Sequence, residues 1–314
     1  MPFVDAPLDA SGEQVVMKAG DLTLTAVTVG GGMRELTAGD WHVLDGYGRD
    51  EVARGAYGQV LVPWPNRLSE GLYKFEGRQY GVPWTEPSKR NALHGFARWE
   101  RWTVLRHDGA SAVLGIVLAP RTGYPFALEV EVEYRVSPSA VDVEIRGRNV
   151  GRTDLPYANG FHPYVTVGAP SIDGCLLELP GRTWLPTDER QIPTGRSPVD
   201  GTGYDFTKPR PIGAMHIDTA YTDLAREGDG MARVRLSTAD GSRSVAVRLG
   251  EAYPYVMAYT GDTLADEPRR RRSLGVEPMT AAPNAFQTGE GLTVLRPGET
   301  HVARWGIEVY RDDA

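Results

Sequence analysis

The stretch Leu128-Glu129-Val130-Glu131-Val132-Glu133-Tyr134-Arg135-Val136 alternates apolar and polar side chains over its whole length. Successive side chains of a β-strand point to opposite faces, so this pattern predicts a strand with one face on a core and the other in water. Ser137-Pro138-Ser139 is typical of a turn, and the apolar residues Val141, Val143 and Ile145 then alternate with charged ones. The sequence therefore predicts two antiparallel strands joined by a short connection.

Strand-like segments of the same kind occur along almost the whole chain. The other predicted strands are Val15 to Met17, Leu22 to Val29, Trp41 to Leu44, Val60 to Val62, Trp99 to Leu105, Ala112 to Leu118, Leu176 to Leu179, Ala232 to Leu236, Val245 to Leu249, Tyr255 to Tyr259 and Val302 to Tyr310. No window of about twelve residues fits a helical period, and 37 glycines and 23 prolines supply turn residues. This pattern favours an all-β protein, either an antiparallel sandwich or a barrel. We expect one domain over residues 1–314, with long loops at 186–217 and 262–272.

The composition narrows the class of protein. The chain has 34 Lys and Arg against 41 Asp and Glu, a net charge of −7, which disfavours nucleic acids and anionic membranes as main partners. Cys175 is the only cysteine, so no intrachain disulfide can form, which suits a reducing compartment. Residues Met1 to Asp5 show no signal-peptide pattern, and no apolar stretch is long enough to span a bilayer. We therefore expect a soluble, cytoplasmic protein.

The segment from Pro63 to Gly95 contains a predicted hairpin with a polar motif at each end. Its two strands alternate on either side of a Glu76-Gly77 turn, which brings Asn66-Arg67 close to the segment Asn91 to His94. The polar side chains of Asn66 and Arg67, held next to His94 by a rigid hairpin, suggest a binding site. The alternative is that Arg67 pairs with a surface carboxylate and that His94 caps a loop.

Two further motifs carry residues suited to proton transfer. His162 lies in the aromatic segment Tyr157 to Tyr164, and its ordinary pKa of about 6.5 suits a proton donor near neutral pH. Glu277 lies in the segment Gly275 to Thr280, which we interpret as a strand followed by a loop broken by Pro278. A carboxylate that is fixed and poorly hydrated makes a useful general base. Taken singly, the two residues could also be a core histidine bonded to the backbone and a glutamate facing solvent.

Together these motifs resemble the aldose 1-epimerase (galactose mutarotase) family, from about Gly31 to Val309. The markers are Pro65-Asn66-Arg67, Gly71 with Gly77, Leu93-His94-Gly95, His162-Pro163-Tyr164, Asp218 with Tyr221, and Val276-Glu277-Pro278-Met279-Thr280. The resemblance implies a large antiparallel β-sandwich with a sugar bound in an open cleft on one sheet. It also implies interconversion of the α and β anomers of a free aldose, with no metal and no cofactor.

The resemblance assigns a role to each matching residue. It implies that Glu277 is the general base and His162 the general acid. It implies that the sugar is bound by the remaining motif residues, Asn66, Arg67, His94 and Asp218. Mutarotation needs a base at the C1 hydroxyl and an acid at the ring oxygen, and the two exchange roles on ring closure. Arg67 and His94 can donate hydrogen bonds to sugar oxygens, whereas Asp218 can accept one from a ring hydroxyl.

Other features bear on the choice of sugar. Three aromatic residues could offer a flat apolar face to the ring or lie in the core: Trp64, Tyr164 and Phe286. Val165-Thr166-Val167 stands where many galactose mutarotases have Phe-Asn-Leu, which leaves a galactose preference open. Arg269 to Arg272 is a run of four cations, either a solvated loop or an anion clamp for a phosphorylated or sulfonated sugar. We favour a neutral sugar because three acidic residues close to the run offer it local partners: Asp262, Asp266 and Glu267.

The expected partner is therefore a small-molecule sugar, and the protein is expected to be a monomer or a homodimer. Alternatives are an epimerase for an anionic hexose and a carbohydrate-binding sandwich without turnover, because a fold does not fix a function. A glycoside-active enzyme needs two carboxylates that flank the bond, and only Glu277 and Asp218 qualify. The presence of both Glu277 and His162 favours the mutarotase over a binding module.

Overall fold

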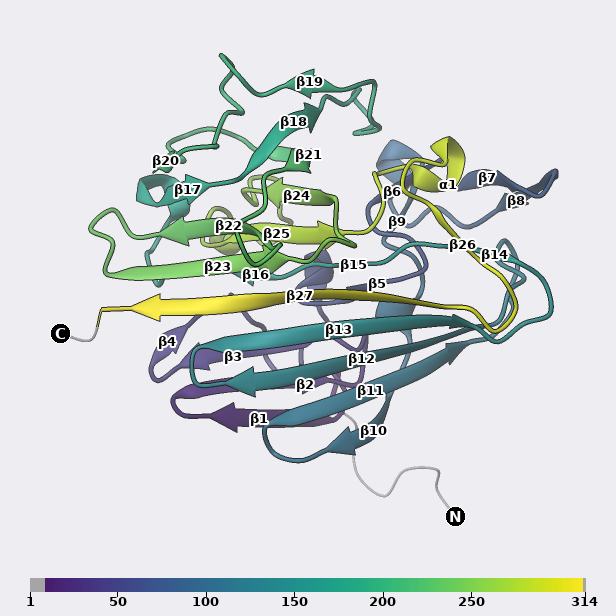
Figure 1. The fold of residues 1–314 in the computed structure, drawn as a ribbon, viewed down its shortest axis with the longest axis horizontal. Coiled ribbons are helices and arrows are strands. Elements are labelled where there is room, and N and C mark those ends of the chain that lie inside the picture. The colour runs from purple at the N-terminus through teal and green to yellow at the C-terminus, as the bar shows by residue number, and fades with distance from the viewer. Residues whose placement is uncertain (1–8, 313–314) are drawn as a thin grey trace.

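The structure of the protein, a computed structural model, describes residues 9–312. Residues Met1 to Asp5, where we expect no signal peptide, lie outside this range. Apart from α1 (Ala285–Thr288) and short 3-10 turns, the regular structure of the described residues is β-strand (Figure 1). None of the described helices is long and apolar enough to cross a membrane. The prediction of an all-β fold is confirmed.

The largest sheet, here called sheet I, has nine strands in the order β10-β11-β12-β13-β27-β23-β22-β17-β20, each antiparallel to its neighbours. Their bounds are β10 (Thr103–His107), β11 (Ser111–Leu118), β12 (Leu128–Ser137), β13 (Ala140–Asn149), β17 (Leu176–Glu178), β20 (Arg210–Pro211), β22 (Ala232–Ser237), β23 (Arg243–Leu249) and β27 (Thr300–Arg311). The alternating stretch quoted above is β12, and it pairs with β13 as predicted, from Leu128 opposite Asn149 to Ser137 opposite Ala140. The apolar side chains of β12 are buried because they face the core.

The second sheet, here called sheet II, contains eight strands in the order β19-β18-β21-β24-β25-β15-β5, with β16 also paired to β25. Their bounds are β5 (Val60–Leu61), β15 (Gly160–Phe161), β16 (Tyr164–Val165), β18 (Gly181–Leu185), β19 (Ser197–Pro198), β21 (Asp218–Leu224), β24 (Tyr255–Tyr259) and β25 (Leu274–Met279). The sequence did not predict β18 or β21, because neither shows a clear alternation of apolar and polar residues. Both strands are needed to place the candidate site described below.

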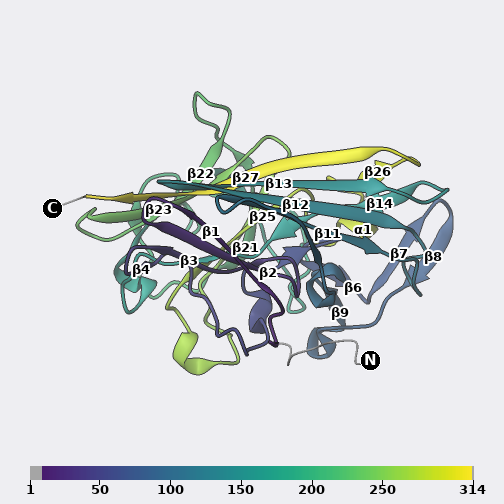
Figure 2. The same cartoon turned by 90° about the horizontal axis from the view of Figure 1, so that it is seen from below.

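A third sheet of four strands, sheet III, covers part of sheet I. It runs β1 (Gln14–Ala19), β2 (Leu22–Val27), β3 (Met33–Ala38) and β4 (Trp41–His42), and β1 and β2 contact β12. Figure 2 shows sheet I along one side of the molecule, with sheets II and III on its other side. Between sheets I and II, the rings of Phe161 and Trp305 lie 4.9 Å apart. One continuous core therefore joins the three sheets, with members from Val15 to Val309.

The hairpin predicted from the segment between Pro63 and Gly95 is present. Its strands are β7 (Leu72–Phe75) and β8 (Arg78–Gly81), and both Glu76 and Gly77 have the positive φ that a two-residue hairpin turn of type I′ requires. Just outside it, β6 (Arg67–Ser69) pairs with β9 (Asn91–Leu93). The two polar motifs are therefore neighbours in space, as predicted.

Two predictions at the ends of elements are corrected by the structure. The strand predicted from Trp99 begins only at Thr103, because Trp99 is the last residue of the 3-10 turn η3 (Ala97–Trp99). The two predicted long loops contain the short strands β19 and β20 and the turn η5 (Glu267–Arg269).

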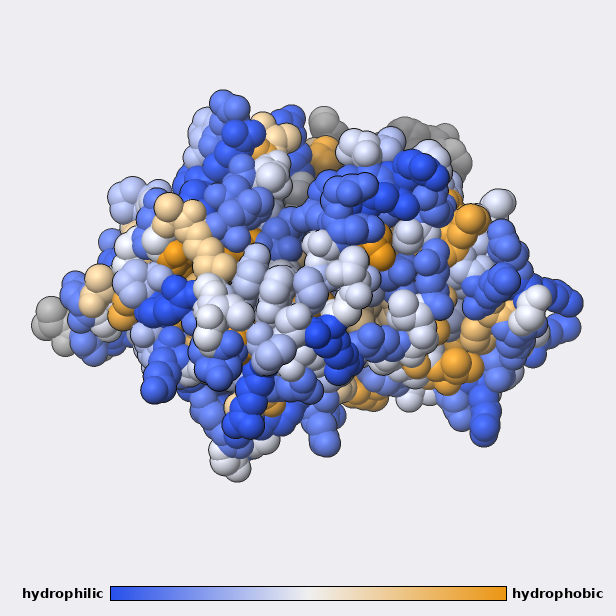
Figure 3. Space-filling view, turned by 90° about the horizontal axis from the view of Figure 1, so that it is seen from above, coloured by the Kyte–Doolittle hydropathy of each residue, from blue (hydrophilic) through white to orange (hydrophobic). Residues whose placement is uncertain are grey.

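A two-stranded pair, β14 (Leu155–Tyr157) with β26 (Thr293–Leu295), completes the fold. The face seen in Figure 3 is mainly hydrophilic, with apolar residues in small groups.

Candidate active site

Glu277 lies inside β25, which pairs with β24 along one edge and with β15 and β16 along the other. The prediction that a loop starts at Pro278 is wrong, because Pro278 keeps the strand conformation opposite Val256. Only 2% of Glu277 is exposed, and its Oε2 has no hydrogen-bond partner among the described residues. Burial raises the pKa of Glu277 to about 8, with the charge of Asp218 adding to this effect and that of Arg67 opposing it.

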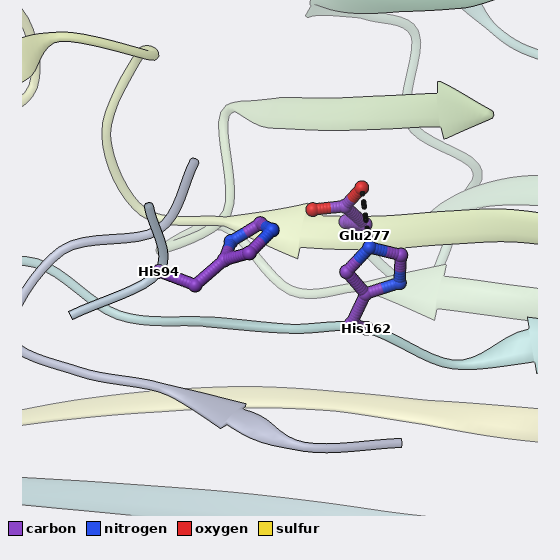
Figure 4. Close-up of side chains that lie close together, drawn as sticks. All are labelled: His94, His162 and Glu277. Atoms are coloured by element: carbon purple, nitrogen blue, oxygen red, sulfur yellow. Dashed lines mark ion pairs between the residues drawn. The ribbon is translucent and has the colours of Figure 1, made fainter. Parts of the chain in front are cut away.

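His162 lies between β15 and β16 and faces Glu277 (Figure 4). Its backbone N–H donates to the carbonyl of Gln59 at 3.2 Å, and its carbonyl accepts from the N–H of Gly58 at 2.9 Å. Its ring stacks on that of Tyr164, with 4.7 Å between the ring centroids. These contacts fix the imidazole, and its Nε2 lies 3.2 Å from Oε1 of Glu277.

The protonation of this pair differs from the sequence-based expectation. Burial lowers the pKa of His162 to about 3, and the positive charges of Arg98 and Arg67 add to the effect. A free imidazolium near neutral pH is therefore disfavoured. Because the pKa of Glu277 is raised to about 8 at the same time, the pair holds one proton at neutral pH, on the carboxyl group of Glu277 next to Nε2 of His162. Such a pair can give a proton at one atom and accept one at the other.

His94 follows β9 and approaches the pair from the opposite wall (Figure 4). Its Nδ1 accepts a hydrogen bond from the backbone N–H of Asn66 at 3.1 Å, and the backbone N–H of His94 donates to the Asn66 carbonyl at 2.9 Å. Burial lowers the pKa of His94 well below its usual value, and nearby positive charges add to this effect. The ring is therefore neutral with its proton on Nε2, because Nδ1 is the acceptor. His94 thus offers an N–H donor to the cavity.

Arg67 is the first residue of β6 and is fixed by Glu86. Its Nε and Nη2 donate to the two carboxylate oxygens of Glu86 at 2.9 and 3.0 Å. Asn91 also donates to Glu86, at 3.1 Å. Burial alone would lower the pKa of Arg67, but the hydrogen bonds with Glu86 and the charge of Asp218 outweigh it and raise the pKa. Arg67 therefore pairs with a carboxylate, as in the alternative considered above, but this carboxylate, Glu86, is only partly exposed rather than on the surface.

Asp218 begins β21, opposite Tyr259 of β24. Its carboxylate accepts a hydrogen bond from the side chain of Gln191, which belongs to the long loop between β18 and β19. A ring hydroxyl could replace this donor, because a carboxylate accepts several hydrogen bonds. Asp218 is therefore placed to accept from a ligand, and its charge contributes to the raised pKa of Glu277.

One cavity of about 500 Å³, a size typical of small-molecule sites, contains all of these groups. The six residues predicted from the sequence line it: Asn66, Arg67, His94, His162, Asp218 and Glu277. Of the three aromatic candidates, only Tyr164 lines the cavity. Trp64 and Phe286 are buried against each other, with ring centroids 5.3 Å apart.

Sequence reasoning missed several residues of the cavity wall, among them Glu86, Arg98 and Trp99. The segment containing Glu86 gives no local signal, because its role depends on Arg67, which lies on another strand. Arg98 and Trp99 follow the His94 motif directly, and that closeness in sequence was the one available indication. The alternation pattern instead predicts that Trp99 lies in a strand.

His94, His162 and Glu277 are also the one group of three potential metal ligands found in residues 9–312, with their ligand atoms within 4.8 Å of one another. Two imidazoles and a carboxylate are a ligand set that transition metals accept. The positive charges of Arg67 and Arg98 lower the pKa of both histidines and act against a bound cation in the same way. The proton chemistry below therefore assigns these side chains no metal.

The run Arg269 to Arg272 lies mostly outside the cavity wall. Arg269 lines the cavity, and its guanidinium lies 3.6 Å from Asp45 and 3.4 Å from Asp266. The remaining ion pairs are Arg269 with Glu51, Arg270 with Glu267, Arg271 with Asp173 and Asp262, and Arg272 with Asp45. All three local acids named from the sequence are therefore partners of the run, together with three acids from distant parts of the chain.

Comparison with known proteins agrees with this fold. Residues 13–308 match the family model described as aldose 1-epimerase. The chain belongs to the aldose 1-epimerase family. It is 33% identical to the uncharacterized protein YihR of Escherichia coli over 94% of this chain and 92% of that protein. It is 29% identical to human galactose mutarotase over 66% of this chain and 63% of that protein.

Solved structures share the fold at low sequence identity. A GalM/aldose epimerase homologue from C. elegans superposes with a TM-score of 0.84 at 17% identity, over 96% of this chain and 99% of that one. Galactose 1-epimerase from Lactobacillus acidophilus gives a TM-score of 0.81 at 16% identity, over 98% of both chains. The antiparallel, multi-sheet fold is therefore that of galactose mutarotase-like proteins.

Proposed function

We propose that the protein is a mutarotase, which interconverts the α and β anomers of a free hexose. The observation that carries this proposal is the 3.2 Å separation between Nε2 of His162 and Oε1 of Glu277 in the wall of the cavity. In a pyranose, the C1 hydroxyl and the ring oxygen are bonded to the same carbon. An acid and a base that act on these two oxygens must therefore lie close together, within hydrogen-bond reach of both.

Ring opening begins when the Glu277 carboxylate takes the proton of the C1 hydroxyl while His162 gives a proton to the ring oxygen. Before this step, the carboxyl group of Glu277 passes its proton from Oε1 to Nε2 of His162, 3.2 Å away, which leaves Glu277 as a carboxylate. The bond between C1 and the ring oxygen breaks as C1 forms a carbonyl. After rotation about the C1–C2 bond, His162 takes the proton back from the C5 hydroxyl and Glu277 returns one to the aldehyde oxygen. The ring closes as the other anomer, with atoms and protons balanced.

The other polar residues of the cavity support these transfers. The Nε2–H of His94 donates to a sugar oxygen and stabilises negative charge that develops there. The guanidinium of Arg67, held in place by Glu86, supplies further donors. Asp218 accepts from a ring hydroxyl in place of Gln191 and so orients the sugar.

The test is polarimetry on freshly dissolved α-glucose, α-galactose and an anionic hexose, with and without the protein. We expect the rate for at least one sugar to rise in proportion to protein concentration. The variant Glu277→Gln should lose this activity because an amide cannot take the proton, while sugar affinity stays within about tenfold, or about 1.4 kcal/mol. Activity of the variant within twofold of the wild type would remove Glu277 from the mechanism.

The non-catalytic alternative makes a different prediction for the same experiment. A carbohydrate-binding sandwich would bind a sugar of the panel in calorimetry but leave every mutarotation rate at its spontaneous value. Binding without acceleration would therefore replace the mutarotase with a binding module.

A further inference from the structure

Arg98 is a buried cation of the cavity to which the mechanism above gives no role. It belongs to η3, is 6% exposed and lines the same cavity as Glu277. Its guanidinium makes no ion pair or hydrogen bond with any residue from 9 to 312, and its Nε is buried without a partner. Burial of an unpaired charge is unfavourable, and it lowers the pKa of Arg98 to about 10.

The position of Arg98 is nevertheless fixed by its surroundings. Gln59 donates from Nε2 to the Arg98 carbonyl at 2.8 Å, and the N–H groups of Phe96 and Ala97 both donate to the carbonyl of Val62. The guanidinium lies over the ring of Trp99, 4.1 Å from its centroid. An arginine stacked in this way is held with its N–H groups pre-oriented for a ligand.

The other arginines of the cavity are compensated or exposed. Arg67 pairs with Glu86, and Arg269 lies close to Asp45 and Asp266. Arg54 also lines the cavity, but it is exposed to water. Among the described residues of the cavity wall, Arg98 is therefore the buried guanidinium that lacks an anion.

We propose that Arg98 binds an anionic group carried by the sugar, so that the preferred substrate is an aldose with a phosphate, sulfonate or carboxylate group on a carbon other than C1. This inference rests on the proposed mutarotase function and specifies its substrate class. The forked N–H groups of arginine match two oxygens of such a group and form charge-assisted hydrogen bonds with them. The sequence-based prediction of a neutral sugar considered only the run Arg269 to Arg272 and not Arg98.

An anion on Arg98 would also act on the proton-transfer pair. The positive charge of Arg98 lowers the pKa of His162 and of His94. A bound anion cancels this charge, so it raises the proton affinity of His162, which must carry a proton during ring opening. An anionic aldose is therefore expected to have a higher kcat as well as a lower KM than a neutral one.

The experiment compares kcat/KM for glucose, glucose 6-phosphate, a 6-sulfonate of 6-deoxyglucose and glucuronate, measured by NMR exchange between anomers at equilibrium. At least one anionic aldose should exceed glucose by tenfold or more in the wild type, and the anion that does so identifies the group. In Arg98→Gln, the ratio of that anionic aldose to glucose should fall at least tenfold. Arg98→Lys, which keeps the positive charge but not the paired N–H donors of the guanidinium, should retain part of the preference.

The matched control is Arg270→Gln, which removes one positive charge outside the cavity wall and should leave the ratio unchanged. The wild-type comparison does not depend on how the variants fold: glucose equal to or better than every anionic aldose would overturn the inference on its own. That result would leave the mutarotase function in place. If no sugar is turned over, calorimetry on Glu277→Gln separates the two ideas. If an anionic aldose binds more tightly than glucose, and this advantage is lost when Arg98→Gln is added, the anion subsite is supported without the mutarotase function. If the anionic aldose and glucose bind equally, the anion subsite is overturned as well.

Discussion

Nε2 of His162 and Oε1 of Glu277 lie 3.2 Å apart, and this is the one polar contact that either side chain makes among the described residues. The remaining atoms, Nδ1 of His162 and Oε2 of Glu277, are buried without a partner. The two groups are thus removed from water together, and burial drives their pKa values in opposite directions. The consequence is a pair that holds one proton over a wide pH range.

His162→Asn should lower mutarotase activity by about 10²–10⁴-fold, the range for loss of a general acid or base. Asparagine keeps a polar side chain but cannot carry the proton to the ring oxygen. The wild-type kcat/KM should fall as the pH rises through about 8, where the pair loses its proton. A wild-type profile that is flat between about pH 5 and pH 9 would contradict both assignments.

The stability of the protein should depend on pH through Glu277. The folded pKa of about 8 lies above the usual value of 4.5, so the stability from this proton is full below pH 4.5 and is lost as the pH rises through about 8. The lowered pKa of His162 acts in the opposite sense, but only below its usual value of 6.5.

Between pH 6.5 and 8, the free energy of unfolding of the wild type should therefore fall by about 1.4 kcal/mol per pH unit relative to Glu277→Gln. Urea unfolding of both proteins across this range measures the difference. Parallel curves would mean that Glu277 is already ionised in the folded protein.

Gly95, next to His94, should not tolerate a side chain. Its φ is +62°, and a Cβ there would collide with the carbonyl oxygen of Val62. Gly77 is the matched control, because its φ is +75° and a Cβ would have open space. Gly95→Ala should cost about 2 kcal/mol more than Gly77→Ala, from the clash alone. Chemical unfolding measures this, and equal losses would show that the backbone at Gly95 moves away freely.

Arg271 should matter more for stability than Arg270. Arg271 donates to Asp173 and Asp262 at 2.6 and 2.7 Å, and also to the carbonyls of Gly213 and Met215. Replacing it with Ser should lower the free energy of unfolding by about 2 kcal/mol, since charge-assisted hydrogen bonds are lost. Arg270→Ser, which breaks one exposed ion pair and one hydrogen bond to the carbonyl of Leu264, should lower it by about 1 kcal/mol or less. Equal effects of the two changes would show that the Arg271 network does not hold these loops.

Local patterns in the sequence predicted the strands that alternate and the turns that contain glycine. The register of β12 and β13 and the hairpin of β7 and β8 could be read in this way, because side-chain alternation and a positive φ are properties of a few consecutive residues. Strands without alternation, such as β18 and β21, could not, because only their place in sheet II makes them strands.

For the candidate site, the motifs identified six of the residues that line the cavity, although they lie far apart in the chain. What each group does there was decided by the tertiary structure. The proton held by Glu277 and His162, the support of Arg67 by Glu86 and the isolation of Arg98 all depend on which groups exclude water and which charges lie within a few ångströms. Electrostatic interactions depend on distance in space and on burial, and neither quantity can be read from positions along a chain.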